Sequence, residues 1–202
     1  MELGSGIGNF KSVISECICT DLFPNPWLDQ VENAYSLSFA NESVSNLILF
    51  DVWHHLQFPG TALAEFHRVL KNGGRVIIFE PAISALGFVA YGLLHHEPIG
   101  WRKPITWNAP PDFDPNNSAY YAAQGNATRI FKSKQFDQYL NQWDIVETSS
   151  LSAVSYILSG GYSKPQLYPT KCYPLMKNID KALDEFPKLF ATRLLITLEK
   201  KG

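Results

Sequence analysis

Two pairs of adjacent histidines and one glutamate are the side chains that could move a proton in this chain. They are His54, His55, His95, His96 and Glu97. An imidazole gains or loses its proton near neutral pH, so a histidine held against a hydroxyl can act as a general base. A purely structural role in a helix turn or a loop is the alternative for each of them, and the sequence leaves both open.

The tripeptide His95-His96-Glu97 also contains residue types that bind zinc. Adjacent histidines in one segment point in different directions, however, and no further spaced ligands accompany them. We therefore predict no metal site. A contact with a substrate, or a role as base, is the prediction for these three residues.

A glycine-rich turn opens the chain. Gly4, Gly6 and Gly8 stand at alternate positions, which lets the backbone approach a ligand closely, and the helix that follows offers free N–H groups. The dinucleotide fingerprint G-x-G-x-x-G needs its third glycine where this chain has Asn9. The spacing therefore argues against a nicotinamide cofactor.

Acidic residues follow three of the apolar runs that we predict to be strands. Asp21, Asp51 and Glu80 each stand where such a run ends. The carboxyl ends of parallel strands meet at one edge of a sheet, where α/β proteins bind their ligands. Glu80 fits two roles equally well, because its carboxylate could orient a histidine of the segment 82–130 or cap a loop.

Short apolar runs alternate with helical periodicity along the chain, which indicates an α/β fold. The predicted strands are 17–21, a weak one that includes Val31, 46–50, 75–79, 144–148 and 193–200. The predicted helices are 9–15, 62–71, 133–143 and 175–186. The segment Asn72-Gly73-Gly74 should end the second helix in a left-handed cap.

Two long segments interrupt this pattern, at about 82–130 and 151–191. The first is rich in aromatic residues from Trp101 to Tyr121, which form either a minor core or a substrate platform. Long irregular segments in compact domains are usually functional. We predict a single domain over residues 1–202 in which both insertions form a lid. For the stretch Ser159-Gly160-Gly161-Tyr162-Ser163, a turn is the favoured interpretation and a binding loop is the alternative.

The composition excludes several classes of protein. The chain has 202 residues, 46% of them hydrophobic, and a formal net charge of −2, so neither intrinsic disorder nor nucleic acid as the main partner is expected. Its three cysteines are too few for a disulfide framework or a zinc ribbon. No apolar run reaches the roughly 20 residues that span a bilayer. We expect a cytoplasmic protein without membrane contact.

Several of these features together resemble the class I S-adenosylmethionine-dependent methyltransferases. They are Glu2 before the glycine turn, Asp21, Asp51, and Leu70-Lys71-Asn72-Gly73-Gly74 before the next strand. Within residues 2–81 the chain is most similar to the type 11 methyltransferase domain, through Asp51-Val52-Trp53-His54-His55-Leu56 and Arg68-Val69-Leu70-Lys71-Asn72-Gly73-Gly74. The fold implied is a doubly wound, mostly parallel sheet of the seven-stranded Rossmann-like type with an antiparallel last strand.

The resemblance also implies which residues hold S-adenosylmethionine. They are Glu2, Gly4, Ser5, Gly6, Gly8, Asp21, Leu22, Asn33, Ala34, Asp51 and Val52. Asp21 would accept hydrogen bonds from the ribose hydroxyls. Asn33, where the family usually has aspartate, keeps a carbonyl acceptor for the adenine amine. Asp51 and Val52 would lie against the methionine moiety near the sulfonium.

The activity that this implies is methylation of a small-molecule acceptor, most plausibly at oxygen, with His54, His55, His95 or His96 as base. One alternative is a degenerate member of the family that binds a ligand or a partner without activity. Another is a nicotinamide oxidoreductase, which Asn9 disfavours.

The first strand of the resembled fold is expected to be truncated. Met1 stands directly before the glycine turn, so nearly all of that strand is missing from the sequence, although it forms the centre of the sheet. The distance from Gly8 to Asp21 is also short for the family. We therefore expect the first helix to be about one turn shorter.

Overall fold

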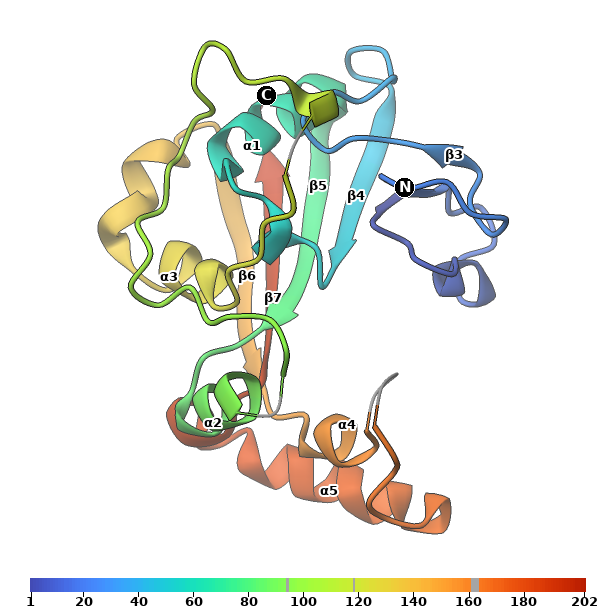
Figure 1. The fold of residues 1–202 in the computed structure, drawn as a ribbon, viewed down its shortest axis with the longest axis vertical. Helices are drawn as coiled ribbons and strands as arrows, with labels where there is room; N and C mark the ends of the chain where they lie inside the picture. Colours follow the sequence, from blue (N-terminus) through green and yellow to red (C-terminus); the bar gives the residue numbers. More distant parts are fainter. Residues whose placement is uncertain (94, 118, 161–163) are drawn as a thin grey trace.

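A seven-stranded sheet forms the centre of the computed structural model, which describes residues 1–93, 95–117, 119–160 and 164–202 (Figure 1). The strand order is β3-β2-β1-β4-β5-β7-β6. The strands are β1 (Glu2–Leu3), β2 (Cys19–Asp21), β3 (Gln30–Val31), β4 (Val44–Phe50), β5 (Leu70–Pro81), β6 (Trp143–Leu151) and β7 (Arg193–Lys200). The first five pair in parallel, and β7 is antiparallel to both of its neighbours. The predicted fold class is therefore confirmed.

One face of the sheet carries most of the core. Leu47 and Leu49 of β4 pair with Val76 and Ile78 of β5, and all four side chains are fully buried. Helices α1 (Pro59–Val69) and α3 (Asn126–Phe131) contact this part of the sheet. Burying such a side chain contributes about 1.5–3 kcal/mol, so this layer fixes the strand ends that carry the site.

The first 43 residues are held together by strands and loops rather than by α-helices. β1 has only two residues but lies between β2 and β4, and the Met1 amino group donates to the Asn46 carbonyl at 3.0 Å. A single 3-10 turn at Asn9–Ser12 replaces the predicted helix 9–15. In residues 13–43, all of which the structure describes, no helix forms.

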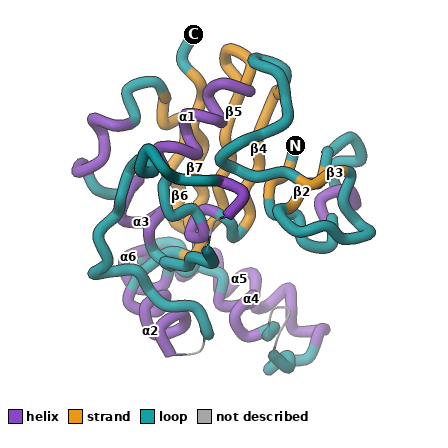
Figure 2. Tube along the Cα trace, turned by 45° about the horizontal axis from the view of Figure 1, so that its top comes forward, coloured by secondary structure: helices purple, strands orange, loops and turns teal. Residues whose placement is uncertain are grey.

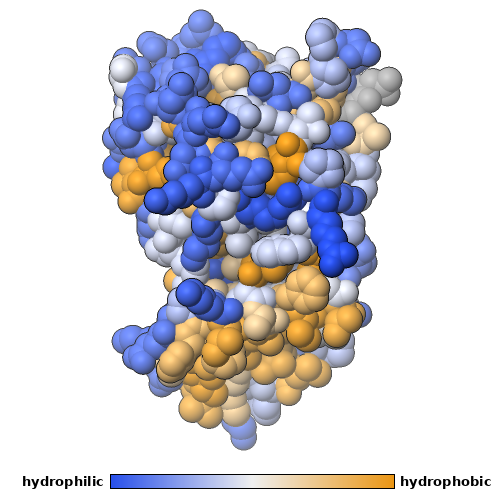
Figure 3. All heavy atoms as spheres, turned by 90° about the vertical axis from the view of Figure 1, so that its left-hand side faces the viewer, coloured by the Kyte–Doolittle hydropathy of each residue, from blue (hydrophilic) through white to orange (hydrophobic). Residues whose placement is uncertain are grey.

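Helices of the two insertions lie beyond the carboxyl ends of β4 and β5 (Figures 1 and 2). They are α2 (Ala85–Leu93), α4 (Val154–Leu158), α5 (Tyr173–Leu183) and α6 (Pro187–Phe190). α2 corrects the expectation of an irregular segment at 82–130, because its apolar run buries Ala90 and Tyr91. The Tyr91 hydroxyl donates to the Thr192 carbonyl at 2.7 Å. Apolar side chains, including the exposed Phe88, gather on this end of the molecule (Figure 3).

Two other element boundaries differ from the prediction. Residues 134–139 form a 3-10 helix, and the chain enters β6 already at Trp143, so the predicted helix 133–143 is wrong. Helix α1 begins at Pro59, a residue suited to a first helical turn because it has no N–H to leave unpaired. It ends at Val69, and Gly73 takes the expected left-handed conformation inside an extended segment.

Of the helices that the structure describes, none combines the length and the apolar character needed to cross a membrane. Part of the predicted turn Ser159-Gly160-Gly161-Tyr162-Ser163, namely residues 161–163, lies outside the described residues.

Candidate functional site

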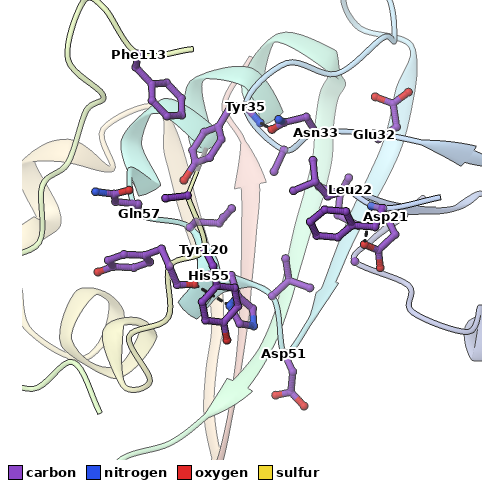
Figure 4. A pocket seen from close by; sticks show the side chains of 18 residues that line it. Asp21, Leu22, Glu32, Asn33, Tyr35, Asp51, His55, Gln57, Phe113 and Tyr120 are labelled. Carbon is purple, nitrogen blue, oxygen red and sulfur yellow. Dashed lines mark hydrogen bonds between the residues drawn. The ribbon is translucent and has the colours of Figure 1, made fainter. Parts of the chain in front are cut away.

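A pocket of about 390 Å³ opens at the carboxyl ends of β1, β2 and β4 (Figure 4). Asp21 and Leu22 stand on one side of it, and His55 and Tyr120 stand on the opposite side. Predicted residues that line it are Gly4, Asp21, Leu22, Asn33, Ala34, Asp51, Val52 and His55. Tyr120 comes from the first insertion, so that segment completes the wall.

The glycine turn and Asp21 belong to the same wall of the pocket. The Gly6 N–H donates to Asp21 Oδ2 at 2.9 Å, which fixes the carboxylate against the turn. A Cβ atom on Gly4 would lie 2.3 Å from Val52 Cγ2. On Gly6 a Cβ would meet none of the described atoms within 4 Å, so this part of the turn faces open space. The structure thus brings together residues 15 positions apart, as the sequence predicts.

A second cavity, of about 590 Å³, lies on the other side of the glycine turn. Glu2, Ser5 and Gly6 line it together with Asp51. Glu2 is buried, and burial raises the pKa of its carboxyl group. Its Oε2 has no hydrogen-bond partner among the described residues, and an unpaired buried carboxylate oxygen is costly unless a donor reaches it. This cavity therefore suits a ligand that carries an N–H donor or a positive charge.

Asn33 connects the first insertion to the wall of the pocket by a hydrogen bond. Its Nδ2 donates to the Pro115 carbonyl at 2.7 Å, and its Oδ1 accepts the Tyr35 N–H at 3.0 Å. The rings of Tyr35 and Phe113 meet edge to face, with centroids 5.2 Å apart. The carboxamide oxygen keeps one lone pair for a ligand, and the aromatic rings give this end of the pocket an apolar wall.

Arg193, a residue that the sequence did not single out, neutralises Asp51. Asp51 has a left-handed backbone (φ 56°), and its carboxylate forms an ion pair with the Arg193 guanidinium. Arg193 is only 4% exposed and lies 4.7 Å from the Tyr156 ring centroid. Burial raises the pKa of Asp51 despite this cation. An arginine at the start of a predicted strand belongs to no recognisable motif. The only signal in the sequence for a cation at this edge of the sheet was that several acidic residues were predicted to lie there.

His54 lies between two carboxylates. Its Nδ1 is 2.7 Å from Glu80 Oε2, and its Nε2 is 3.1 Å from Glu97 Oε2. Glu80 also accepts the Trp53 N–H at 2.7 Å. Burial lowers the pKa of His54, but the two carboxylates outweigh it and raise this pKa to about 10. The structure contains both kinds of contact predicted for Glu80: one carboxylate oxygen accepts the N–H at the start of the turn Trp53–His55, and the other orients a histidine, His54, which lies outside the insertions.

His55 is the histidine that faces the pocket. Its Nδ1 lies 2.9 Å from the Tyr121 carbonyl, and its Nε2 lies 3.5 Å from Glu97 Oε1. The Tyr120 hydroxyl donates to Glu97 at 2.6 Å, which raises the pKa of Tyr120 to about 12. The hydrogen bond from His54, together with those from Tyr120 and Gln124, holds the pKa of Glu97 well below its usual range.

The other two predicted histidines stand at the edge of this group. His95 Nδ1 lies 2.8 Å from Gln124 Nε2, and Gln124 Nε2 also donates to Glu97 at 3.0 Å. Burial lowers the pKa of His95. His96 is exposed and stacks on His95, with ring centroids 4.6 Å apart. His54, His55 and Glu97 therefore meet, and His95 borders them, with its Nδ1 3.8 Å from Glu97 Oε2.

The fold and the pocket define the chain as an α/β protein with a ligand site at the carboxyl edge of a mostly parallel sheet. Residues 1–78 match the family model described as "Methyltransferase domain". The amino-terminal part of the chain is therefore similar to a methyltransferase domain, and the strand order extends a mostly parallel α/β sheet over the whole chain. The search of the curated proteins gave no match.

Solved structures, among them those of possible or putative methyltransferases, share the fold over nearly the whole chain. The YcgJ protein from Bacillus subtilis matches with a TM-score of 0.52 and 18% identity, covering 100% of this chain and 91% of its own. A possible histamine N-methyltransferase from Thermotoga maritima has a TM-score of 0.53 and 15% identity, over 99% and 81% of the two chains. A Haloferax volcanii putative methyltransferase, solved with the Trm112 methyltransferase activator, has a TM-score of 0.53 and 14% identity, over 100% and 81%.

Proposed function

We propose that this protein transfers a methyl group from S-adenosylmethionine to the oxygen of a small-molecule acceptor. One observation carries the proposal: Asp21 and the glycine turn stand on one side of a pocket whose opposite side contains His55 and Tyr120. The first side offers contacts for a nucleoside, and the second offers groups that can handle a proton. A small acceptor, rather than nucleic acid, suits the net charge of −2.

The residues present fit the cofactor. One oxygen of Asp21 is held by the Gly6 N–H, which leaves the carboxylate aimed along the wall with capacity to accept ribose hydroxyls. The unpaired Glu2 Oε2 in the adjoining cavity suits the ammonium group of the methionine part. The apolar wall of Tyr35 and Phe113 suits an adenine ring.

When bound, S-adenosylmethionine supplies a methyl group on a positively charged sulfur, which leaves as a neutral thioether as the new C–O bond forms. The protein must therefore align the acceptor and exclude water. Tyr120, Tyr121 and Phe113 of the first insertion cover the pocket from the side opposite the sheet. We propose that this insertion acts as the lid and forms most of the acceptor site.

The acceptor hydroxyl loses its proton during the transfer, and His55 is the predicted histidine that lines the pocket. The His55–Glu97 pair is the place where this proton can leave the acceptor. His54 has both ring nitrogens engaged by carboxylates, so it acts by holding Glu97 and Glu80 in place.

The test is a transfer assay with isotopically labelled S-adenosylmethionine and a panel of small phenols and alcohols, with the products identified by mass spectrometry. The expected result is labelled ether formation that falls by roughly 10²- to 10⁴-fold in His55→Gln, the usual contribution of a positioned proton acceptor. His67→Gln, a change in α1, is the matched control. Cofactor binding without transfer to any acceptor would instead support a binding module that keeps the fold.

A further inference from the structure

We propose that His54, His55 and Glu97 form a binding site for a divalent transition-metal ion of the zinc type, open toward the pocket. One nitrogen of each histidine and one carboxylate oxygen lie within 4.8 Å of one another. The inference deepens the proposed function and rests on it for the role of the ion, whereas binding of the ion stands on the cluster alone.

The spacing of the three ligand atoms is close to that around one ion. Zinc holds histidine nitrogen and carboxylate oxygen at 2.0–2.2 Å, so two ligands at a tetrahedral angle lie about 3.3–3.5 Å apart. Glu97 Oε2 is 3.1 Å from His54 Nε2, and Glu97 Oε1 is 3.5 Å from His55 Nε2. These two separations involve different oxygens of the same carboxylate. One oxygen and the two nitrogens lie within 4.8 Å of one another, so the side chains must draw closer together for one ion to bind all three.

Both histidines are already oriented as metal ligands usually are. A metal-binding imidazole typically donates its other N–H to a carboxylate or a backbone carbonyl. His54 Nδ1 faces Glu80, and His55 Nδ1 faces the Tyr121 carbonyl, which can only accept a hydrogen bond. Each Nε2 is thereby turned toward the Glu97 carboxylate.

The carboxylates and the imidazole nitrogens that face one another in this cluster would be stabilised by a positive charge between them. In the neutral form of His55 that donates from Nδ1, the Nε2 lone pair points at a carboxylate oxygen, which is also an acceptor. The Glu80 and Glu97 side chains, 1% and 10% exposed, bring two negative charges to the same imidazole. A divalent cation that displaces the proton from His54 Nε2 satisfies these acceptors at once, and it balances both charges.

The cluster is closed toward the protein core and open toward the pocket, so an ion can enter and a coordination position stays available. Glu80 is fully buried and Gln124 is 1% exposed, so the cluster is closed on the side of the protein core. Among the described residues Gln124 Oε1 has no partner, which leaves a further oxygen beside the ligands. The His55 side chain is 33% exposed and lines the pocket. A substrate oxygen can therefore complete the coordination from that side.

The acceptor class follows from this position. An acceptor whose hydroxyl oxygen binds the ion loses its proton more readily, because the cation stabilises the alkoxide or phenolate. The proton passes to solvent through the pocket. With the ion bound, the loss of transfer expected in His55→Gln comes from the lost ligand rather than from a lost proton acceptor. Acceptors with a hydroxyl that can reach this cluster are preferred over amines.

The test is titration of tag-free, chelator-treated protein with Zn²⁺, with Co²⁺ absorption as a second readout of the coordination sphere. We expect one Zn²⁺ per chain, binding lost in His55→Gln and in Glu97→Gln, and an affinity about 10- to 100-fold weaker in Glu80→Gln. His67→Gln must bind as the unchanged protein does. Circular dichroism confirms that each variant is folded, and His55→Gln, the most exposed ligand, keeps the test valid should Glu97→Gln unfold.

Two outcomes overturn the proposal: no Zn²⁺ binding at millimolar concentration by folded protein, or binding that survives both His55→Gln and Glu97→Gln. Titration of S-adenosylmethionine in the presence of chelator separates this result from the proposed function. If the protein binds the metal but not the cofactor, the metal site is supported and the proposed methyl transfer is refuted. If it binds the cofactor but not the metal, only the metal site is refuted.

Discussion

Replacing Gly4 by alanine should damage both the fold and the pocket. Gly4 has φ +70°, a left-handed conformation that costs a residue with a Cβ roughly 1–2 kcal/mol. Its Cβ would also lie 2.3 Å from Val52 Cγ2, well below the 3.4 Å at which ordinary contact begins. Val52 lines the pocket, so the clash must push it or the turn out of position.

The expected loss of stability is the sum of these two effects. Overpacking in a well-packed site costs about 1–3 kcal/mol, so Gly4→Ala should lose about 2–5 kcal/mol in all. Gly73→Ala is the matched control, because Gly73 has the same φ of +70° and a Cβ there would meet none of the described atoms within 4 Å. This control should lose only the backbone cost of about 1–2 kcal/mol.

Two assays on the same two variants measure these effects. Urea denaturation gives the free energy of unfolding, and calorimetry with S-adenosylmethionine gives the affinity. Gly4→Ala should be the less stable variant by about 1–3 kcal/mol, the overpacking cost, and should bind the cofactor more weakly than Gly73→Ala does. Equal stability and equal affinity in the two variants would refute the reasoning that the turn is packed against the pocket through Val52.

Two further substitutions test charges in the fold. Arg193→Leu should destabilise the protein by about 1.5–3 kcal/mol, because it removes the hydrogen-bonded cation from the Asp51 carboxylate, whose side chain is 32% exposed; an unchanged urea midpoint would show that the pair contributes nothing. Burial raises the pKa of Glu65, but hydrogen bonds from Arg68 and the Leu37 N–H outweigh it and lower this pKa. The stability that Glu65 contributes is present above its unfolded pKa of 4.5 and is lost as the pH falls through its lower folded value. Thermal melts from pH 6 to pH 3 should therefore show a steeper decline for the unchanged protein than for Glu65→Gln, and parallel curves would contradict this.

The side of the pocket that we propose binds the cofactor is the part that could be predicted from local sequence. Gly4, Asp21 and Asp51 each stand at a strand end, and a parallel sheet brings such ends to one edge regardless of how the rest of the chain folds. What the local pattern could not show is that Arg193, 142 positions from Asp51, balances its charge.

The opposite side of the pocket depends on tertiary contacts. The prediction that no metal binds considered His95, His96 and Glu97 as one group, since they are adjacent in sequence. The structure instead joins Glu97 to His54 and His55, whose rings lie 4.1 Å apart in a tight 3-10 turn at Trp53–His55. No periodicity in the sequence links positions 43 residues apart.

Element boundaries failed where tertiary structure overrode local preference. Phe136 and Leu140 lie on one face at helical spacing, and both are buried, but the segment that carries them is a 3-10 helix too short to reach β6. Trp143 instead starts the strand and pairs with Lys200 at the end of β7. Trp143, which the periodicity assigned to a helix, therefore belongs to the edge strand β6.

The most direct measurement for the account as a whole is calorimetry of S-adenosylmethionine with the unchanged protein, Asp21→Asn and Asp144→Asn. Asp144 is a carboxylate on β6 whose side chain is 64% exposed, and it controls for the loss of one charge. We predict binding of one cofactor per chain and a loss of about 10- to 100-fold in affinity in Asp21→Asn alone, the effect of hydrogen bonds to a charged group worth about 1.5–3 kcal/mol. Absence of binding to the folded protein, or equal affinity in all three, would contradict the assignment of this pocket to the cofactor.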